Sequence, residues 1–493
     1  MSALDLLIII GFIHCSLFFF NILFRSCLHY PYFLFMENTG LEIKPLRIIW
    51  FTSFFNRNIL KWSMDKTKLL SLWFNLGVIV SIILLPIAFG FIIKMTISNF
   101  LDKSAEGGPV DDNWQLEPMI PGINVPVSDI QYYVITLGIC SIFHEMGHAV
   151  AASRENVQVY GVGFILAFIL PIAYVSINHE QMKLLKIGGQ LRILCAGVWH
   201  NIILAIIAAA IFSSNSWIWA PLYISNSGVY VTSIATNSPL LGPRGLETFD
   251  VIYKINNCDV KNNDDWYHCL LQTIKRPSSG YCVEQTFIEE HDESIPSWMT
   301  ENGVTNCCED NKNDENLCFE YVENLQDPLE LPPYFCLPAR KIIEHSEGLC
   351  QLFTDCLGSE VHCIKPSLDN ITKVVKISTQ KNNVLFLGHP ADIYRTVETS
   401  NWTPKYQIFS PNLPESLELL CKYITVLSAG LAVINIIPCF FFDGQYIIES
   451  LVQSILRSFV RHKSARNSIA LIITCTGSVF FVINLIVTLI KIY

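Results

Sequence analysis

Six long apolar segments constrain the fold of this chain more than any other feature of its sequence. Each contains few or no charged residues and is long enough for a membrane-spanning helix, which needs about 20 apolar residues. The segments lie at residues 4–24, 69–96, 131–152, 193–213, 416–438 and 467–490. Hydrophobic residues make up 51% of the chain and charged residues only 15%, so the chain is more apolar than a typical soluble domain. We therefore predict a polytopic α-helical membrane protein with both termini on one side of the bilayer.

The charged residues between these segments predict how the chain is oriented. Segment 25–68 contains seven lysine or arginine residues, and segment 457–466 contains four. Basic loops stay on the cytosolic side of a membrane, so both segments are expected to face the cytosol. The linker after the second apolar segment is expected on the lumenal side, and its acidic residues are Asp102, Glu106, Asp111, Asp112 and Glu117.

A polar, acidic region with many cysteines separates the fourth and fifth apolar segments. Ten of the 17 cysteines of the chain fall between Cys258 and Cys363. An even number of cysteines in one polar segment predicts disulfides formed in an oxidising compartment. A zinc site built from these cysteines is the weaker alternative, because no CxxC pair occurs among them. Glycosylation sequons at Asn370 and Asn401 favour the same lumenal side.

Strand patterns flank the cysteine-rich part of this region. Residues 228–234 are typical of a strand, and residues 245–257 of a turn and a second strand. These two patterns are interpreted as the start of a PDZ-like domain. Strands are expected again at 374–378 and 384–387. The segment from about 269 to 365 is therefore interpreted as a cysteine-rich insertion into that domain.

Residues 157–177, between the third and fourth apolar segments, differ from the helical segments around them. They combine Gly161, Gly163 and Pro171 with several β-branched residues, which favours a hairpin that dips into the membrane. Non-helical backbone at membrane depth is tolerated only where protein or a water-filled cavity satisfies its amides. The hairpin is therefore expected to pack around a site.

The third apolar segment contains the HExxH motif His144-Glu145-Met146-Gly147-His148. On a helix this motif places two imidazoles one turn apart on one face, with a carboxylate beside them. An ionisable group buried at this depth costs roughly 2.5–3.5 kcal/mol or more. One bound Zn²⁺ offsets that cost by holding both histidines neutral, and Glu145 is then placed as a general base. The alternative is a pair of histidines that only form hydrogen bonds between helices.

Asp443 is the best candidate for a further metal ligand. A hydrolytic zinc site needs three protein ligands and an open position. Asp443 follows an apolar segment directly and comes after three phenylalanines at 440–442, where a carboxylate without a partner is costly to desolvate. Its position is equally compatible with the N-cap of a helix over 445–456.

Taken together, two motifs resemble the paired signatures of site-2 proteases. They are HExxH in one membrane segment and NxxPxxxxDG, here residues 435–444, in a later one. The resemblance extends to Gly197-Val-Trp-His-Asn201, to the PDZ-like region and to Leu387-Gly-His-Pro390. It covers most of the chain and is strongest towards animal members of that family.

The resemblance implies a role for each motif residue. His144, His148 and Asp443 correspond to the ligands of one zinc ion and Glu145 to the catalytic base, while Asn435 and Pro438 shape the cleft. His200 and Asn201 stay outside this ligand set, because polar residues at the start of a span more often serve packing or interhelical hydrogen bonds. Phe442 stands where many relatives have leucine, an exchange between apolar residues that should not disturb the metal.

These implications give a predicted division of the chain. Residues 1–127 hold the first two spans, the cytosolic loop and a short lumenal linker. A membrane-embedded zinc metalloprotease core is formed by residues 128–213 and 416–493. Residues 214–415 form an inserted lumenal PDZ-like domain with its cysteine-rich insertion.

By resemblance, the substrates are membrane-anchored transcription factors of the sterol-regulatory and unfolded-protein-response kinds, already cut by a lumenal protease. The chain itself is expected in the membrane of the Golgi or endoplasmic reticulum, with its active site near the cytosolic face. The partners expected are therefore transmembrane-helix proteins and lipid, and no nucleic acid, because the chain has no basic stripe. A membrane protease of the prenyl-protein type is disfavoured, since its third ligand would be a glutamate. A non-catalytic scaffold that binds peptides through the PDZ-like domain is the other alternative, and it has no need of Glu145.

Overall fold

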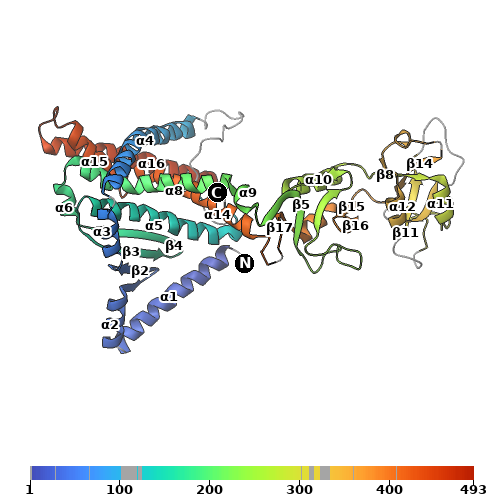
Figure 1. Cartoon of the computed structure of the whole chain (residues 1–493), viewed down its shortest axis with the longest axis horizontal. Coiled ribbons are helices and arrows are strands. Elements are labelled where there is room, and N and C mark those ends of the chain that lie inside the picture. Colours follow the sequence, from blue (N-terminus) through green and yellow to red (C-terminus); the bar gives the residue numbers. More distant parts are fainter. Residues whose placement is uncertain are drawn as a thin grey trace. The chain divides into compact units, whose positions relative to one another are not determined.

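The computed structural model describes residues 3–27, 29–65, 67–101, 119, 125–300, 303–309, 316–322, 333–358, 360–406 and 408–492. The acidic linker residues predicted to be lumenal, 102–117, lie outside the described residues. The chain divides into two compact units (Figure 1). Met1–Ser214 and Glu418–Tyr493 form one of them, called the membrane unit below, and Asn215–Leu417 form the inserted unit.

Within the described ranges, six helices are long and apolar enough to cross a membrane. The six predicted apolar segments are thereby confirmed as helices, the second of them with a mean hydropathy of 2.8 over Lys68–Ser98. The spanning helices are α1 (Ala3–Cys27), α4 (Thr67–Leu101), α5 (Ile130–Arg154), α8 (Ala196–Ser213), α14 (Leu413–Ile436) and α16 (Lys463–Ile492). Shorter helices of the same unit are α2 (His29–Thr39), α3 (Asn56–Asp65), α6 (His179–Leu184), α7 (Ile187–Leu194) and α15 (Asp443–Ile455).

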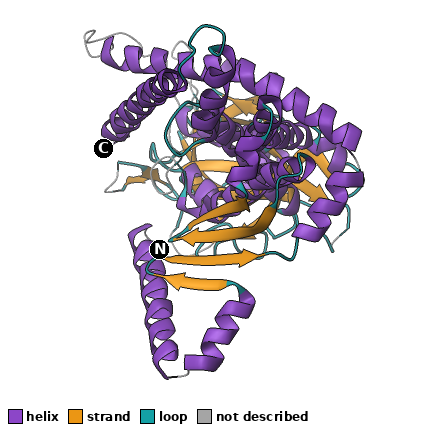
Figure 2. Ribbon diagram, turned by 90° about the vertical axis from the view of Figure 1, so that its left-hand side faces the viewer, coloured by secondary structure: helices purple, strands orange, loops and turns teal. Residues whose placement is uncertain are grey.

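An antiparallel sheet accompanies the helices of the membrane unit. Its described strands are paired in the order β1-β2-β3-β4, and Figure 2 shows them in orange between the N-terminal helices and the other helices of the unit. Their bounds are β1 (Leu41–Lys44), β2 (Arg47–Thr52), β3 (Val159–Ala167) and β4 (Leu170–Ile177). The hairpin predicted over 157–177 is confirmed as β3 and β4. Strands β1 and β2 were not predicted, because the basic segment 25–68 was interpreted only as a linker.

The core of the membrane unit joins helices from both parts of the sequence. Buried side chains of α4, α7 and α8 pack in one cluster with those of α14, α15 and α16. Close packing also depends on residues without side chains. A Cβ at Gly147 of α5 would lie 2.7 Å from the carbonyl oxygen of Ala196 in α8. The two helices can therefore approach each other at the level of the HExxH motif.

The inserted unit contains two larger sheets. The first has the strand order β16-β15-β6-β5-β17, with β7 paired to β6. Its strands are β5 (Tyr223–Ile234), β6 (Val251–Ile255), β7 (Cys258–Asp259), β15 (Lys373–Thr379), β16 (Asn383–Gly388) and β17 (Val397–Pro404), accompanied by α9 (Asn215–Trp219), α10 (Asn263–Lys275) and α13 (Pro390–Thr396). The strands predicted at 228–234, 374–378 and 384–387 are confirmed.

A second sheet is inserted in the sequence between β7 and β15. Its strands follow the order β12-β11-β14-β8-β13. They are β8 (Gly280–Glu284), β11 (Asn316–Tyr321), β12 (Tyr334–Pro338), β13 (Leu349–Cys350) and β14 (Val361–Pro366), with helices α11 (Gln285–His291) and α12 (Ala339–His345) and the short pair β9 (Trp298–Met299) and β10 (Thr305–Asn306).

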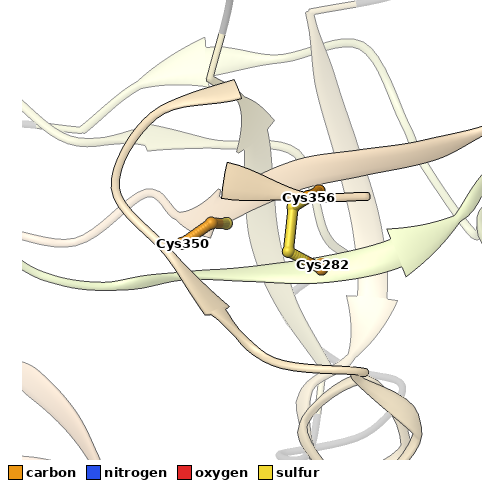
Figure 3. A group of neighbouring side chains, drawn as sticks. All are labelled: Cys282, Cys350 and Cys356. Carbon is orange, nitrogen blue, oxygen red and sulfur yellow. A yellow bond between two sulfur atoms is a disulfide. The ribbon is translucent and has the colours of Figure 1, made fainter. Parts of the chain in front are cut away.

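All ten cysteines between 258 and 363 are described, and they form five disulfides. The pairs are Cys258–Cys269, Cys282–Cys356, Cys307–Cys318, Cys308–Cys336 and Cys350–Cys363. Figure 3 shows the Cys282–Cys356 bond, with Cys350 of a neighbouring disulfide beside it. The predicted disulfides are confirmed. Because each of these sulfurs is already bonded to another sulfur, the alternative of a zinc site among them finds no support.

Candidate metal centre

The two histidines of the HExxH motif face the same side of α5. Their side chains are one helical turn apart and buried, each residue being 8% exposed. Their Nε2 atoms lie 3.2 Å from each other. The spacing of the motif on a regular helix therefore produces the pair of imidazoles that the sequence predicts.

Asp443 reaches this pair from the start of α15. Its Oδ2 atom lies 3.1 Å from Nε2 of His144 and 3.2 Å from Nε2 of His148. The helix N-cap is Phe442, and no hydrogen bond from a described side chain caps α15. The alternative in which Asp443 serves as the N-cap is therefore wrong, and its carboxylate points to the histidines instead.

The three atoms form a nearly equilateral triangle with sides of 3.1–3.2 Å. The Asp443 Oδ2 atom is buried, yet it accepts no well-aligned hydrogen bond from any described residue. The two imidazole nitrogens and the Asp443 oxygen are therefore close because all three point to one common position, and not because the imidazoles donate hydrogen bonds to the carboxylate. A tetrahedral ion with bonds of about 2.0–2.1 Å separates its ligand atoms by about 3.3 Å. The donor set fits such an ion.

Each imidazole has a second partner that bears on its orientation. His148 bonds through Nδ1 to the carbonyl oxygen of Ile193 at 2.8 Å, which directs its Nε2 into the triangle. His144 has its Nδ1 3.3 Å from the amide nitrogen of Asn201, whose Oδ1 is buried without a partner in the described chain. Exchanging the oxygen and nitrogen of that amide lets Asn201 accept a hydrogen bond from Nδ1 of His144. The prediction that Asn201 serves interhelical hydrogen bonds is thereby confirmed, and its partner is one of the two motif histidines.

Glu145 lies beside the triangle and contacts the sheet. One carboxylate oxygen accepts a hydrogen bond of 3.0 Å from the backbone N–H of Val175 in β4. One turn earlier on α5, the hydroxyl of Ser141 accepts a bond of 2.7 Å from the N–H of Ala173. The donor atoms of His144, Glu145 and His148 lie within 4.8 Å of one another. The hairpin thus packs around the site, as predicted.

His200 and Pro438 are not part of the triangle. The His200 ring bonds through Nδ1 to the Ala196 carbonyl at 2.8 Å and packs against Trp73 and Phe74. Pro438 lies in the break between α14 and α15, where a Cβ on Gly477 of α16 would be 2.1 Å from its carbonyl oxygen.

The remaining two motif residues lie on other helices. Asn435 is in the last turn of α14. His389 caps α13, because its side chain accepts from the N–H of Ala391. Of the predicted site residues, the structure brings together His144, Glu145, His148 and Asp443.

Gly197 lies against both histidines, although the sequence analysis identified it only as part of a motif. A Cβ at this position of α8 would lie 2.3 Å from Nε2 of His148 and 2.5 Å from Cε1 of His144. We expect Gly197→Ala to weaken metal binding by roughly 10- to 100-fold, the range found for residues that orient metal ligands. The physical reason is that the new methyl group displaces both rings from the triangle.

Metal affinity measured by competition with a chelator tests this expectation. Gly430→Ala is the matched control, since a Cβ at Gly430 of α14 meets no described heavy atom within 4 Å. Equal affinities for the two variants would show that α8 does not restrict the metal centre.

Membrane-spanning helices around a buried centre of two imidazoles and two carboxylates are features of a membrane-embedded metalloprotease. The profile of Peptidase family M50 matches residues 132–483 of the chain. This match covers more than half of its length, so the chain belongs to peptidase family M50, the site-2 protease family. The predicted family is confirmed.

A curated relative agrees with this assignment. The chain is 23% identical to a membrane-bound transcription factor site-2 protease homolog of Arabidopsis thaliana. The alignment spans 452 residues and covers 81% of this chain and 84% of the relative. The protein is thus an integral membrane metalloprotease of the site-2 protease family.

Proposed function

We propose that the chain is an intramembrane zinc endopeptidase in which His144, His148 and Asp443 hold one zinc ion and Glu145 is the general base. The observation that carries this proposal is the triangle of two imidazole nitrogens and one carboxylate oxygen with sides of 3.1–3.2 Å. Two neutral nitrogens and one anionic oxygen are a ligand set typical of catalytic zinc, which keeps a further position open.

Zinc, when bound, supplies a Lewis acid that polarises a peptide carbonyl and makes water more acidic. The residues of the chain do the rest. Glu145 takes a proton from the attacking water and passes it to the leaving amine. The N–H of Val175 holds one oxygen of that carboxylate, so the other is left for the proton. Ile193 and Asn201 keep the two rings turned towards the triangle.

The substrate backbone is proposed to bind along β4. A transmembrane helix hides its amides, so its peptide bonds become accessible only after local unwinding. Added strands bind to a sheet through its outer amides. On β4 the N–H of Ala173 bonds to the hydroxyl of Ser141 on α5 and not to another strand, and an incoming strand can replace that hydroxyl while Val175 keeps its bond to Glu145.

Disulfide trapping tests this placement. With a cysteine at Ile172, a half-exposed residue of β4, substrate cysteines near the cut site are expected to be captured at every second position, the period of a strand. A cysteine at Leu184 of α6, which is 87% exposed, serves as the control. Capture with no such alternation, or none at all beside β4, would contradict the pairing.

We infer further that the substrates are membrane-anchored transcription factors, cut after an earlier lumenal cleavage, with release of a cytosolic fragment. The Arabidopsis relative is named for this class of protein, and a protease embedded in a membrane has membrane proteins as its natural substrates. The disulfides support a lumenal inserted unit in the Golgi or endoplasmic reticulum, and the basic segments 25–68 and 457–466 support the opposite side for the cut product.

The first sheet of the inserted unit, with α10 and α13, is proposed to be the PDZ-like domain. Its role would be to exclude substrates that keep a large lumenal portion. A scaffold that only binds peptides is disfavoured, because such a protein gains nothing from Glu145 beside the metal ligands.

A further inference from the structure

A partly buried ion pair joins α7 to the C-terminal end of α5, and the mechanism above makes no use of it. The Arg192 guanidinium in α7 donates two parallel hydrogen bonds, of 2.8 and 2.9 Å, to Glu155, the C-cap residue that follows α5. A third bond of 3.1 Å runs from Arg192 to the side chain of Asn75 in α4. The Arg192 and Glu155 side chains are 25% and 13% exposed. Such forked pairs fix geometry as well as adding energy. These three residues are called the Arg192 clamp below.

Helix α7, which the clamp holds, contacts both elements that carry the metal ligands. On the α5 side, its Ile193 carbonyl is the partner of His148 Nδ1, and Ile193 is fully buried. On the α15 side, its buried residues cluster with Ile447 and Ile448, and its Gln190 accepts a hydrogen bond of 3.4 Å from Ser450. A shift of α7 would therefore move the partner of one ligand and the support of the helix that begins at Asp443.

Little within α7 itself fixes its position. It is eight residues long, and no hydrogen bond from a described side chain caps its start at Lys186. A helix this short has marginal stability on its own. Its placement must come from contacts with other elements. The ion pair between Arg192 and Glu155 is one such contact. Gly189 makes room for it, because a Cβ at that position would lie 3.0 Å from a carboxylate oxygen of Glu155.

We propose that the Arg192 clamp is a positioning device for the metal centre, which acts by holding the Ile193 carbonyl against His148 and α7 against α15. Arg192 and Glu155 are thus positioning residues and not ligands. The proposal rests on the proposed function, since it assumes that the triangle binds a metal.

The test uses the full chain in detergent with two mild variants. Glu155→Gln keeps the shape of the side chain and removes its charge, while Arg192→Lys keeps the charge and removes the fork. Both are expected to weaken zinc binding by roughly 10-fold, the lower end of the range for residues that orient ligands, and to shift the visible absorption bands of bound Co²⁺. Turnover should fall with little change in KM. Lys183→Gln is the control, because its ion pair with Glu180 on α6 is exposed.

Unfolding midpoints measured with excess chelator separate a positioning role from a purely structural one. If the variants lower that midpoint but bind zinc and Co²⁺ as the wild-type chain does, the clamp serves folding alone and the proposal is overturned. If one variant fails to fold, the other decides the question by the same measurements. A wild-type chain that binds neither metal would instead overturn the proposed function, so the two failures are distinct.

Discussion

Glu145→Gln is expected to leave zinc bound and to remove peptide cleavage. Glutamine has nearly the same shape, and its amide oxygen can still accept the hydrogen bond from Val175, but it cannot take a proton from water. A positioned general base contributes roughly 10²- to 10⁴-fold to a rate, so turnover should fall by about that factor. The measurement is the appearance of cytosolic fragments from membrane-anchored transcription factors, together with the zinc content of the purified variant.

The control for this prediction is Glu180→Gln, a change in an exposed carboxylate on α6 that is 85% exposed. The Glu180→Gln variant should release fragments at the wild-type rate. Fragment release by Glu145→Gln within about threefold of wild type would contradict the role of Glu145 as base, given the much larger factor expected. Loss of zinc from this variant would instead assign Glu145 to metal binding.

Asp443→Ala is expected to lose both the metal and the activity. The substitution removes the carboxylate from the triangle and leaves only the two imidazoles of α5. Apparent binding free energies of roughly 10–16 kcal/mol for four-ligand zinc sites correspond to about 3 kcal/mol per ligand, so the affinity should fall by roughly 10²- to 10³-fold. Dialysis against a graded series of chelators, followed by metal analysis, measures this loss.

Glu449→Ala is the matched control for Asp443→Ala, because Glu449 is an exposed carboxylate on the same helix. Its metal affinity should equal that of the wild-type chain. Unchanged zinc binding by Asp443→Ala would remove the carboxylate from the coordination sphere, and the hydrolytic account would need another third ligand.

Local sequence patterns predicted much of the fold and the part of the site that the HExxH motif contributes. Hydropathy located the six spanning helices because each carries its signal within about 20 residues. HExxH placed His144, Glu145 and His148 together because its spacing matches one helical turn. The structure then set Asp443 beside them, which the residues alone had left open between a ligand and a helix cap.

Contacts between distant segments were harder to predict. The roles of the Ile193 carbonyl and of Gly197 could not be predicted from the sequence. Every residue has a backbone carbonyl and every glycine lacks a Cβ, so nothing in the sequence distinguishes these two positions from others. Strands β1 and β2 lie in a basic segment without clear alternation, and they form because β3 offers them an edge. The disulfide pairing was equally out of reach, because ten cysteines in one segment permit many connectivities.

The insertion of a large folded unit between the two halves of the membrane core also has a consequence for biosynthesis. The ribosome makes both histidines early, and roughly 300 further residues separate His148 from Asp443, which takes about 15–60 s at 5–20 residues per second. Through that interval the nascent chain has the proposed general base, Glu145, but not the proposed third ligand, Asp443. If Asp443 is the third ligand, an unfinished chain carries an inert centre and becomes active only after the inserted unit has been synthesised.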